Sequence, residues 1–204
     1  MFITFEGTEG SGKSLQARRL VERLRERGQS VLATREPGGT PLGDQLRELV
    51  LLRDDLGVGA RAEALLMCAS RAQHVERVIR PALERGEIVV CDRFSDSTLV
   101  YQGAGRGLDT ATLVSVISFA TAGLQPELTV LLDLPVEIGL ARKHPHEDWN
   151  RFEAETRDFH QRVRDAYQAL ARAEPRRWVC FDGRKPAAEL ADEIWQRVAA
   201  QMEL

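Results

Sequence analysis

A glycine-rich stretch near the start of the sequence has the residue types and spacing of a phosphate-binding loop. Its residues match the pattern G-x-x-x-x-G-K-[ST] and are Gly7, Thr8, Glu9, Gly10, Ser11, Gly12, Lys13 and Ser14. Glycines let the backbone curl so that its N–H groups face phosphate oxygens, and the lysine can reach the outer phosphates. The Ser14 hydroxyl is suited to bind Mg²⁺. The loop therefore predicts binding of a nucleoside triphosphate with Mg²⁺.

The segments on either side of this loop are those that a phosphate loop requires. Residues 2–5 are an apolar run that predicts a buried strand, and leucine and valine recur at helical spacing after Lys13. The N-terminus of that helix would add partial positive charge beside the phosphates. A chance glycine turn is the alternative, and the strand before it and the helix after it argue against that alternative.

A second candidate site consists of Asp92 and Arg93, which come directly after another apolar run, residues 88–91. A carboxylate at the end of such a strand can help hold Mg²⁺ directly or through water, and a guanidinium beside it can bind phosphates through two N–H groups. The alternative is an ion pair at the surface. In a parallel sheet the carboxyl ends of the strands share one edge, so we expect this pair beside the phosphate loop and the loop at residues 35–40.

Strand and helix patterns alternate along the chain, which predicts an α/β fold. The expected strands are residues 2–5, 30–34, 88–91, 128–132 and 178–181. The expected helices are one that ends at residue 28, 43–53, 61–84, 95–102, 109–122, one that starts at 135, 151–173 and 187–201. With the phosphate loop after the first strand, this order predicts a P-loop NTPase fold: a five-stranded parallel sheet, helices on both faces and a short lid. We expect a single domain, residues 1–204, with the lid at about residues 142–151.

The composition narrows the partners and the compartment. A formal net charge of −3 argues against a nucleic-acid surface, and no apolar run approaches the roughly 20 residues of a membrane span. The first residues lead directly into a strand, without a targeting segment. Cys68, Cys91 and Cys180 lie far apart among apolar neighbours, so we expect buried, reduced thiols. These features predict a cytoplasmic protein that acts on small molecules.

Two absent motifs narrow the class of nucleotide-binding protein. Guanine-specific GTPases require an N-K-x-D loop, but Asn150, the one asparagine in the chain, is followed by Arg151. The catalytic-loop motif of protein kinases is also missing. Two alternatives remain: a small enzyme that transfers phosphate to a small molecule, or an ATPase that works as a switch through a partner.

Four segments in order resemble the thymidylate kinases of the bacterial type. They read F-E-G-T-E-G-S-G-K-S, R-E-P-G-G-T, D-R-F-S-D-S-T-L-V-Y-Q-G and L-L-D-L-P-V-E-I-G-L-A-R. The resemblance covers nearly the whole chain. It implies transfer of the γ-phosphate of ATP to dTMP, giving dTDP, with Mg²⁺ as cofactor and a homodimeric assembly. Another nucleoside monophosphate kinase, or a kinase of unphosphorylated deoxynucleosides, is the nearest alternative.

The resemblance also implies roles for individual residues. Arg71 would read the thymine base, Glu9 would lie near the sugar 3′-hydroxyl, and Tyr101 would pack against the deoxyribose and disfavour a 2′-hydroxyl. Arg93 would bridge the donor and acceptor phosphates while Asp92 organises Mg²⁺. The other implied substrate residues line the base pocket or flank the acceptor phosphate: Thr98, Gln102, Arg35 and Glu36.

The sequence departs from the family pattern at two places. Met67 stands where the family usually has a phenylalanine against thymine; methionine is apolar and adaptable enough to replace it, or belongs simply to the core. In the lid, Arg142 and Lys143 precede His144 and His146, where several arginines would be expected. We expect Arg142 to supply most of the lid charge and count it as catalytic, together with Lys13, Asp92 and Arg93. Protonated imidazoles are expected to assist it at low pH, and the two histidines lack the third ligand that a metal site would need. The remaining histidines, His74 and His160, are expected on helix surfaces.

Overall fold

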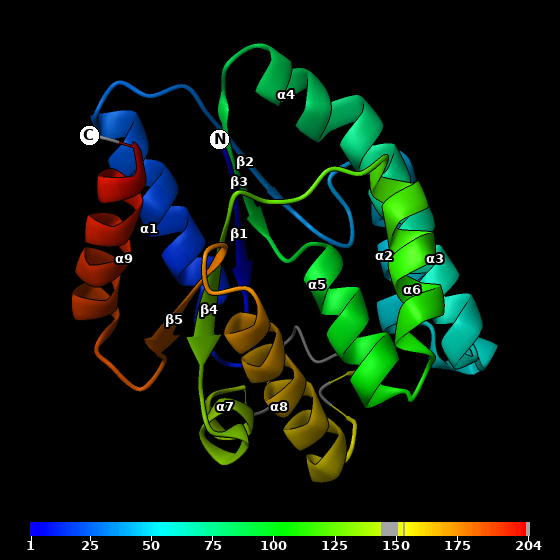
Figure 1. Cartoon of the computed structure of the whole chain (residues 1–204). Coiled ribbons are helices and arrows are strands. Elements are labelled where there is room, and N and C mark those ends of the chain that lie inside the picture. The colour runs from blue at the N-terminus through cyan, green and yellow to red at the C-terminus, as the bar shows by residue number, and fades with distance from the viewer. Residues whose placement is uncertain (144–150, 153, 203–204) are drawn as a thin grey trace.

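The computed structural model describes residues 1–143, 151–152 and 154–202 and has a parallel sheet at its centre (Figure 1). Its strands are β1 (Phe2–Glu6), β2 (Val31–Arg35), β3 (Ile88–Asp92), β4 (Leu128–Asp133) and β5 (Trp178–Asp182). They lie in the order β2-β3-β1-β4-β5, and every neighbouring pair is parallel. All five predicted strands are confirmed, with bounds shifted by one residue. β1, β3 and β4 read as nearly continuous apolar runs because both faces of the sheet are covered.

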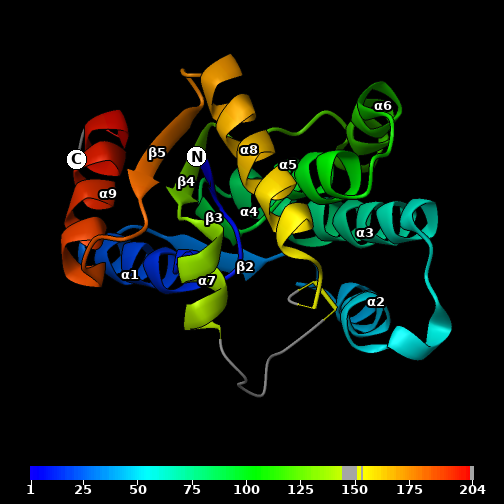
Figure 2. The same ribbon diagram turned by 90° about the horizontal axis from the view of Figure 1, so that it is seen from below.

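Helices cover both faces of the sheet, as predicted (Figure 2). On one face, α1 (Lys13–Glu26) and α9 (Ala187–Met202) pack against alternate strand residues such as Ile3 and Phe5. On the other face, α4 (Arg80–Glu84) and α8 (Arg157–Ala173) contact β3, β4 and β5. The side chains between them, Phe2 and Leu131 included, form separate apolar clusters.

The remaining helices frame the end of the sheet where the strands have their carboxyl termini. They are α2 (Pro41–Leu52), α3 (Ala60–His74), α5 (Ser95–Thr98), α6 (Thr110–Thr121) and α7 (Val136–Arg142). A 3₁₀ turn, η1 (Asp54–Leu56), follows α2. α3 packs against α2 and α6 beside the sheet, whereas α7 follows β4 and leads to the residues of the predicted lid.

Three predicted helices are interrupted or differ in their bounds by more than two residues, and the others differ by one or two. The helix expected over residues 61–84 is interrupted by a π-helical turn, η2 (Val75–Ile79), because Pro81 has no N–H group to donate to the preceding turn. A second π-helical turn, η3 (Leu99–Gly105), extends α5 beyond residue 102. The helix expected from residue 151 begins only at Arg157, where the Thr156 side chain accepts a hydrogen bond from the Phe159 N–H at 3.3 Å.

The cysteines are all free, but they are not all buried. Cys68 and Cys91 are buried as predicted, whereas Cys180 is exposed, so the prediction was wrong there. Cys180 lies on β5, an edge strand that the helices cover only in part. Across the described ranges, no helix has both the length and the hydropathy needed to span a bilayer. The lid residues 144–150, with His144 and His146, lie outside the described residues.

Candidate active site

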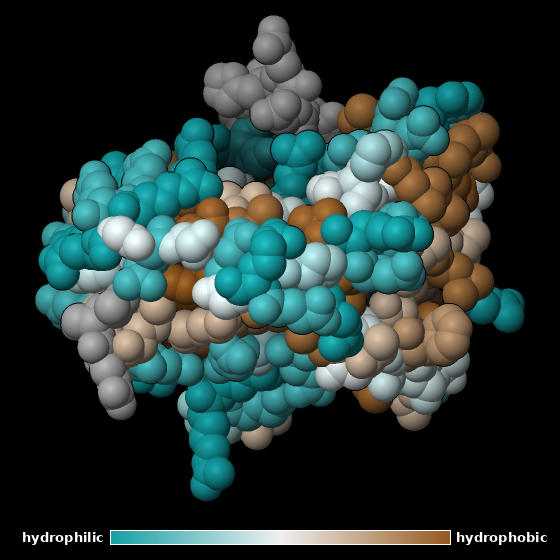
Figure 3. Space-filling model, turned by 90° about the horizontal axis from the view of Figure 1, so that it is seen from above, coloured by the Kyte–Doolittle hydropathy of each residue, from teal (hydrophilic) through white to brown (hydrophobic). Residues whose placement is uncertain are grey.

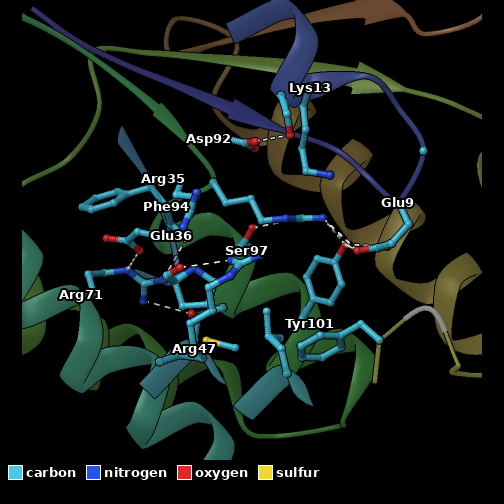
Figure 4. A pocket seen from close by; sticks show the side chains of 18 of the residues that line it. Glu9, Lys13, Arg35, Glu36, Arg47, Arg71, Asp92, Phe94, Ser97 and Tyr101 are labelled. Atoms are coloured by element: carbon cyan, nitrogen blue, oxygen red, sulfur yellow. Dashed lines mark hydrogen bonds and ion pairs between the residues drawn. The ribbon is translucent and has the colours of Figure 1, made fainter. Parts of the chain in front are cut away.

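A pocket of about 950 Å³ opens at the carboxyl ends of β1, β2 and β3 (Figure 4). This is the edge where ligands bind in open parallel sheets. Most of the predicted site residues line it: Glu9, Gly10, Gly12, Lys13, Ser14, Arg35, Glu36, Met67, Arg71, Asp92, Arg93, Thr98, Tyr101, Gln102 and Arg142. Gly7, Thr8 and Ser11 belong to the same loop and are buried, but they do not line the pocket.

The phosphate loop connects β1 to the N-terminus of α1 and requires glycine where it touches α7. Gly10 has a φ of +69°, and a Cβ there would lie 2.1 Å from the carbonyl oxygen of Gly139. Lys13 donates to the Thr8 carbonyl at 3.3 Å, so its side chain folds back over the loop. Burial, helped by the charge of Arg93, lowers the pKa of Lys13 to about 8. The loop thus holds a cation that gains from the arrival of an anion.

Ser14 and Asp92 form a pair of oxygen ligands beside the loop. The Ser14 hydroxyl donates a hydrogen bond to Asp92 Oδ2, although the two residues are far apart in sequence. Asp92 Oδ1 is buried, and no polar atom of the described chain pairs with it. Mg²⁺ prefers hydroxyl, carboxylate and water oxygens, and a carboxylate oxygen left without a partner is suited to it. The residues present therefore fit Mg²⁺.

Arg93 lies between the phosphate loop and the rest of the pocket. Its Nη2 donates to Glu9 Oε1 at 2.9 Å and to the Tyr101 hydroxyl at 3.0 Å. Its Nη1 donates to Tyr167 at 3.1 Å and to Ser97 at 3.3 Å. Burial alone would lower the pKa of Arg93, but the surrounding hydroxyls and carboxylates raise it well above its ordinary value. The backbone φ of +69° is unusual for a residue other than glycine and marks a constrained position.

Glu9 is held ionised opposite Arg93. Burial raises its pKa, but the charge of Arg93, the contact with His160, the charge of Lys13 and the hydrogen bond from Tyr101 together outweigh burial, so the pKa lies below the ordinary range. Both carboxylate oxygens accept from the Tyr101 hydroxyl, at 2.8 and 2.9 Å. Glu9 can therefore only accept hydrogen bonds, as a group that receives a substrate hydroxyl must.

Arg71 occupies the other end of the pocket, where α3 faces α5. Its Nε donates to Glu36 Oε2 at 2.7 Å, and its Nη groups donate to Thr98 Oγ1 at 3.0 Å and the Phe94 carbonyl at 3.1 Å. Glu36 also contacts His74 Nδ1 at 3.0 Å. Figure 4 shows Arg71 and Glu36 on one side of the pocket and Glu9 and Tyr101 on the other. The two ends thus differ in chemistry, since Arg71 can only donate hydrogen bonds whereas Glu9 can only accept them.

Both histidines expected on helix surfaces are buried, so those predictions were wrong. His74 is enclosed by the loop after β2, where a Cβ on Gly39 would lie 2.6 Å from His74 Nε2. That nitrogen lies 2.7 Å from Thr34 Oγ1. His160 lies on the buried side of α8, with its Nδ1 3.6 Å from Glu9 Oε2. Each histidine supports a carboxylate of the pocket.

Two of the predicted residues lie at the mouth of the pocket. The side chain of Arg35 is 61 % exposed, and its Nη2 is 3.9 Å from Asp44. Arg142 ends α7 and donates to the Gly183 carbonyl at 2.9 Å.

Sequence analysis missed several residues of the lining, among them Arg47, Ser97 and Phe152. Arg47 adds a further cation and donates to the Pro37 carbonyl at 3.2 Å. The Phe152 ring packs edge-on against Tyr101 with centroids 5.3 Å apart, and Met67 belongs to the same apolar cluster. The aromatic residue directly after the lid was the available signal for Phe152.

Comparison with known proteins agrees with this geometry. The family model described as thymidylate kinase matches residues 5–194. A thymidylate kinase of Thermomicrobium roseum is 52 % identical over 98 % of this chain and 95 % of its own length, and one of Synechococcus sp. is 52 % identical over 100 % and 97 %. The crystal structure of thymidylate kinase from Ehrlichia chaffeensis, 34 % identical, superposes with a TM-score of 0.74 and covers 89 % of this chain and 91 % of that one. The chain therefore has the P-loop NTPase fold and belongs to the thymidylate kinase family.

Proposed function

We propose that the pocket transfers phosphate from ATP to dTMP and that its individual residues have the roles given below. As a thymidylate kinase, the chain phosphorylates dTMP to dTDP with ATP as the phosphate donor. The observation that carries the assignment of roles is the position of Arg93. Its guanidinium touches both Glu9 of the phosphate loop and Tyr101 of η3. A group held there can contact the phosphates of donor and acceptor together.

In this proposal the phosphate loop holds the donor. The backbone N–H groups from Gly10 to Ser14 and the ammonium of Lys13 bind the β- and γ-phosphates. Ser14 and Asp92 hold Mg²⁺, which neutralises phosphate charge when bound. Arg142 adds positive charge from the end of α7. Each of these groups is set before the reaction, so little reorganisation accompanies phosphoryl transfer.

The acceptor occupies the side of the pocket between α3 and η3. Arg71, Thr98 and Gln102 read the base, with Met67 and Phe152 as its apolar surroundings. The sugar then faces Glu9 and Tyr101, where the ionised carboxylate of Glu9 accepts a hydrogen bond from the 3′-hydroxyl. The phenol lies against the ring position where a ribonucleotide would carry its extra hydroxyl. Glu36 supports this site through Arg71, while Arg35 and Arg47 face the acceptor phosphate.

Phosphoryl transfer needs positioning and charge neutralisation rather than covalent help. Arg93 and Lys13 supply charge where the two phosphates meet. Arg93 donates its hydrogen bonds to fixed partners, which keeps its guanidinium in one place. A lid over about residues 142–151 would exclude water, which competes with dTMP as the acceptor.

We also propose that the chain forms a single domain, assembles as a homodimer and works in the cytoplasm. Exposed apolar side chains on the packed pair α3 and α6 support the dimer: Phe119 is 89 % exposed, and Leu65 and Val114 are also exposed. Apolar surface gathers on the same side of the molecule (Figure 3). Leu113 and Ile117 of α6 are instead buried in the core. The free thiols are typical of a reducing compartment.

The test is release of ADP from ATP and Mg²⁺ in the presence of dTMP, dUMP, dCMP, dGMP, AMP or thymidine. We expect ADP formation that depends on dTMP and is distinctly slower with dUMP. Arg93→Met should lower kcat far more than it raises KM for either substrate, because its charge acts mainly in the transition state. ATP hydrolysis that is indifferent to every acceptor would refute the kinase assignment and favour a nucleotide switch.

A further inference from the structure

A buried carboxylate behind the base pocket accepts hydrogen bonds from three side chains at once. Glu63, in the first turn of α3, has no exposed surface. Its Oε1 accepts from Gln102 Nε2 at 2.7 Å. Its Oε2 accepts from Arg106 Nη2 at 3.3 Å and from Arg151 Nη2. Two guanidinium groups therefore favour the ionised form of Glu63, and an ionised carboxylate can only accept hydrogen bonds.

This contact fixes which way the Gln102 amide points. A side-chain amide has a donor end and an acceptor end of almost the same shape, so its surroundings decide its orientation. Because Glu63 can only accept, the NH₂ group must face it, and the carbonyl oxygen is left for the pocket that Gln102 lines. Within the described ranges, no donor pairs with that oxygen.

We infer that Glu63 determines the class of pyrimidine that the enzyme accepts, acting through Gln102. The inference rests on the proposed function. Thymine and uracil carry an N–H group at position 3 and a carbonyl at position 4, whereas cytosine carries an acceptor nitrogen and an amino group there. The fixed amide oxygen of Gln102 accepts a hydrogen bond from the N–H group of thymine or uracil. It repels the acceptor nitrogen of cytosine. Arg71 beside it offers only donors, which suit a carbonyl.

Glu63 is thus a positioning residue, and its effect should appear in discrimination rather than in overall activity. The measured quantity is kcat/KM for dTMP divided by kcat/KM for dCMP. In Glu63→Gln the partner can donate as well as accept, so the Gln102 amide is free to turn over. The ratio should fall at least about tenfold, the value of one hydrogen bond of roughly 1.4 kcal/mol.

A second variant guards against misfolding. Glu63→Asp keeps a negative charge near Arg106 and Arg151, but its shorter side chain no longer reaches the Gln102 amide. The ratio of dTMP to dCMP should therefore be lower than in the wild type in this variant too. Glu155→Gln is the matched control: Glu155 contacts the same Arg106 but does not contact Gln102, and its ratio should equal that of the wild type.

A double variant separates this role from general damage to the site. In a Gln102→Met background the ratio is already reduced, and adding Glu63→Gln should change it less than twofold. An unchanged ratio in both Glu63 variants, with Gln102→Met lowering it, would overturn the role of Glu63. A further loss in the double variant equal to that in Glu63→Gln alone would also overturn it. Failure of the wild type to phosphorylate dTMP would instead refute the proposed function.

Discussion

Replacement of Glu36 by glutamine should destabilise the protein strongly, because it leaves a buried charge without a counterion. Arg71 and Glu36 are each only 3 % exposed at the side chain, and 2.7 Å separates Nε from Oε2. Burial lowers the pKa of Arg71, and the charge and hydrogen bond of Glu36, with smaller contributions from Cys68 and Glu6, together more than reverse that effect. The glutamine would keep the shape but lose the charge, while Arg71 stays charged.

Removing one partner of a buried ion pair costs about 3–5 kcal/mol. We expect the lower end of that range, about 3 kcal/mol, because Arg71 keeps its hydrogen bonds to Thr98 and the Phe94 carbonyl. At roughly 2–4 °C per kcal/mol for a chain of this size, the melting temperature should fall by about 6–12 °C. Urea unfolding of the unliganded protein measures the same loss as a lower midpoint with an unchanged slope.

The reasoning has an internal check. Glu36→Gln combined with Arg71→Met removes the unpaired charge, so the double variant should recover part of the lost stability. Asp192→Asn, which breaks the exposed pair with Arg23, should have little effect and serves as the control. A loss below about 1 kcal/mol for Glu36→Gln, or a double variant less stable than the single one, would refute the account of this pair.

Three further predictions concern the phosphate side of the site. Burial raises the pKa of Glu6 to about 7 from an ordinary 4.5, so its contribution to stability is complete below pH 4.5 and is lost as pH rises through 7. Between pH 5 and 7.5 the free energy of unfolding of the wild type, measured in urea, should therefore fall relative to that of Glu6→Gln. Parallel plots of this free energy against pH for the two proteins would contradict the prediction. Burial lowers the pKa of Lys13 to about 8, so kcat/KM for ATP should fall as pH rises through 8; a flat profile to pH 9.5 would exclude a charged Lys13 as the reason for binding. In Gly139→Ala the new Cβ would lie 2.4 Å from the Glu9 carbonyl oxygen and must displace the phosphate loop, raising KM for ATP about tenfold or more. Gly59→Ala, where the Cβ meets open space, should leave KM for ATP unchanged.

The parts of the site that could be predicted from sequence are those with local signals. The spacing of glycine, lysine and serine before Ser14 identified the phosphate loop, and the apolar run before Asp92 identified a strand end. The parallel sheet then brings these ends together, whatever the intervening chain does. For this reason Ser14 and Asp92 could be assigned to one edge of the sheet before the structure was known.

The parts that could not be predicted depend on packing between distant segments. His74 stands in a sequence of mixed polar and apolar residues that does not predict burial, and it is buried because the loop after β2 covers it. His160 is buried because one side of α8 lies over the pocket. The exposure of Cys180 follows from the edge position of β5, which a local pattern does not reveal. The amide orientation of Gln102 depends on Glu63 in another helix, so no pattern around residue 102 contains it.

The central position of β1 also has a consequence for synthesis of the chain. β1 is made first, but its two neighbours in the sheet begin only at residues 88 and 128. Its side chains are buried in the finished fold. One edge of β1 stays unpaired until β3 is complete at residue 92, and the other until β4 is complete at residue 133, when more than half of the 204 residues have been made. Pairings between such distant segments form slowly, and an unpaired apolar strand is prone to aggregate. Folding of this enzyme during translation should thus be most vulnerable before β4 emerges.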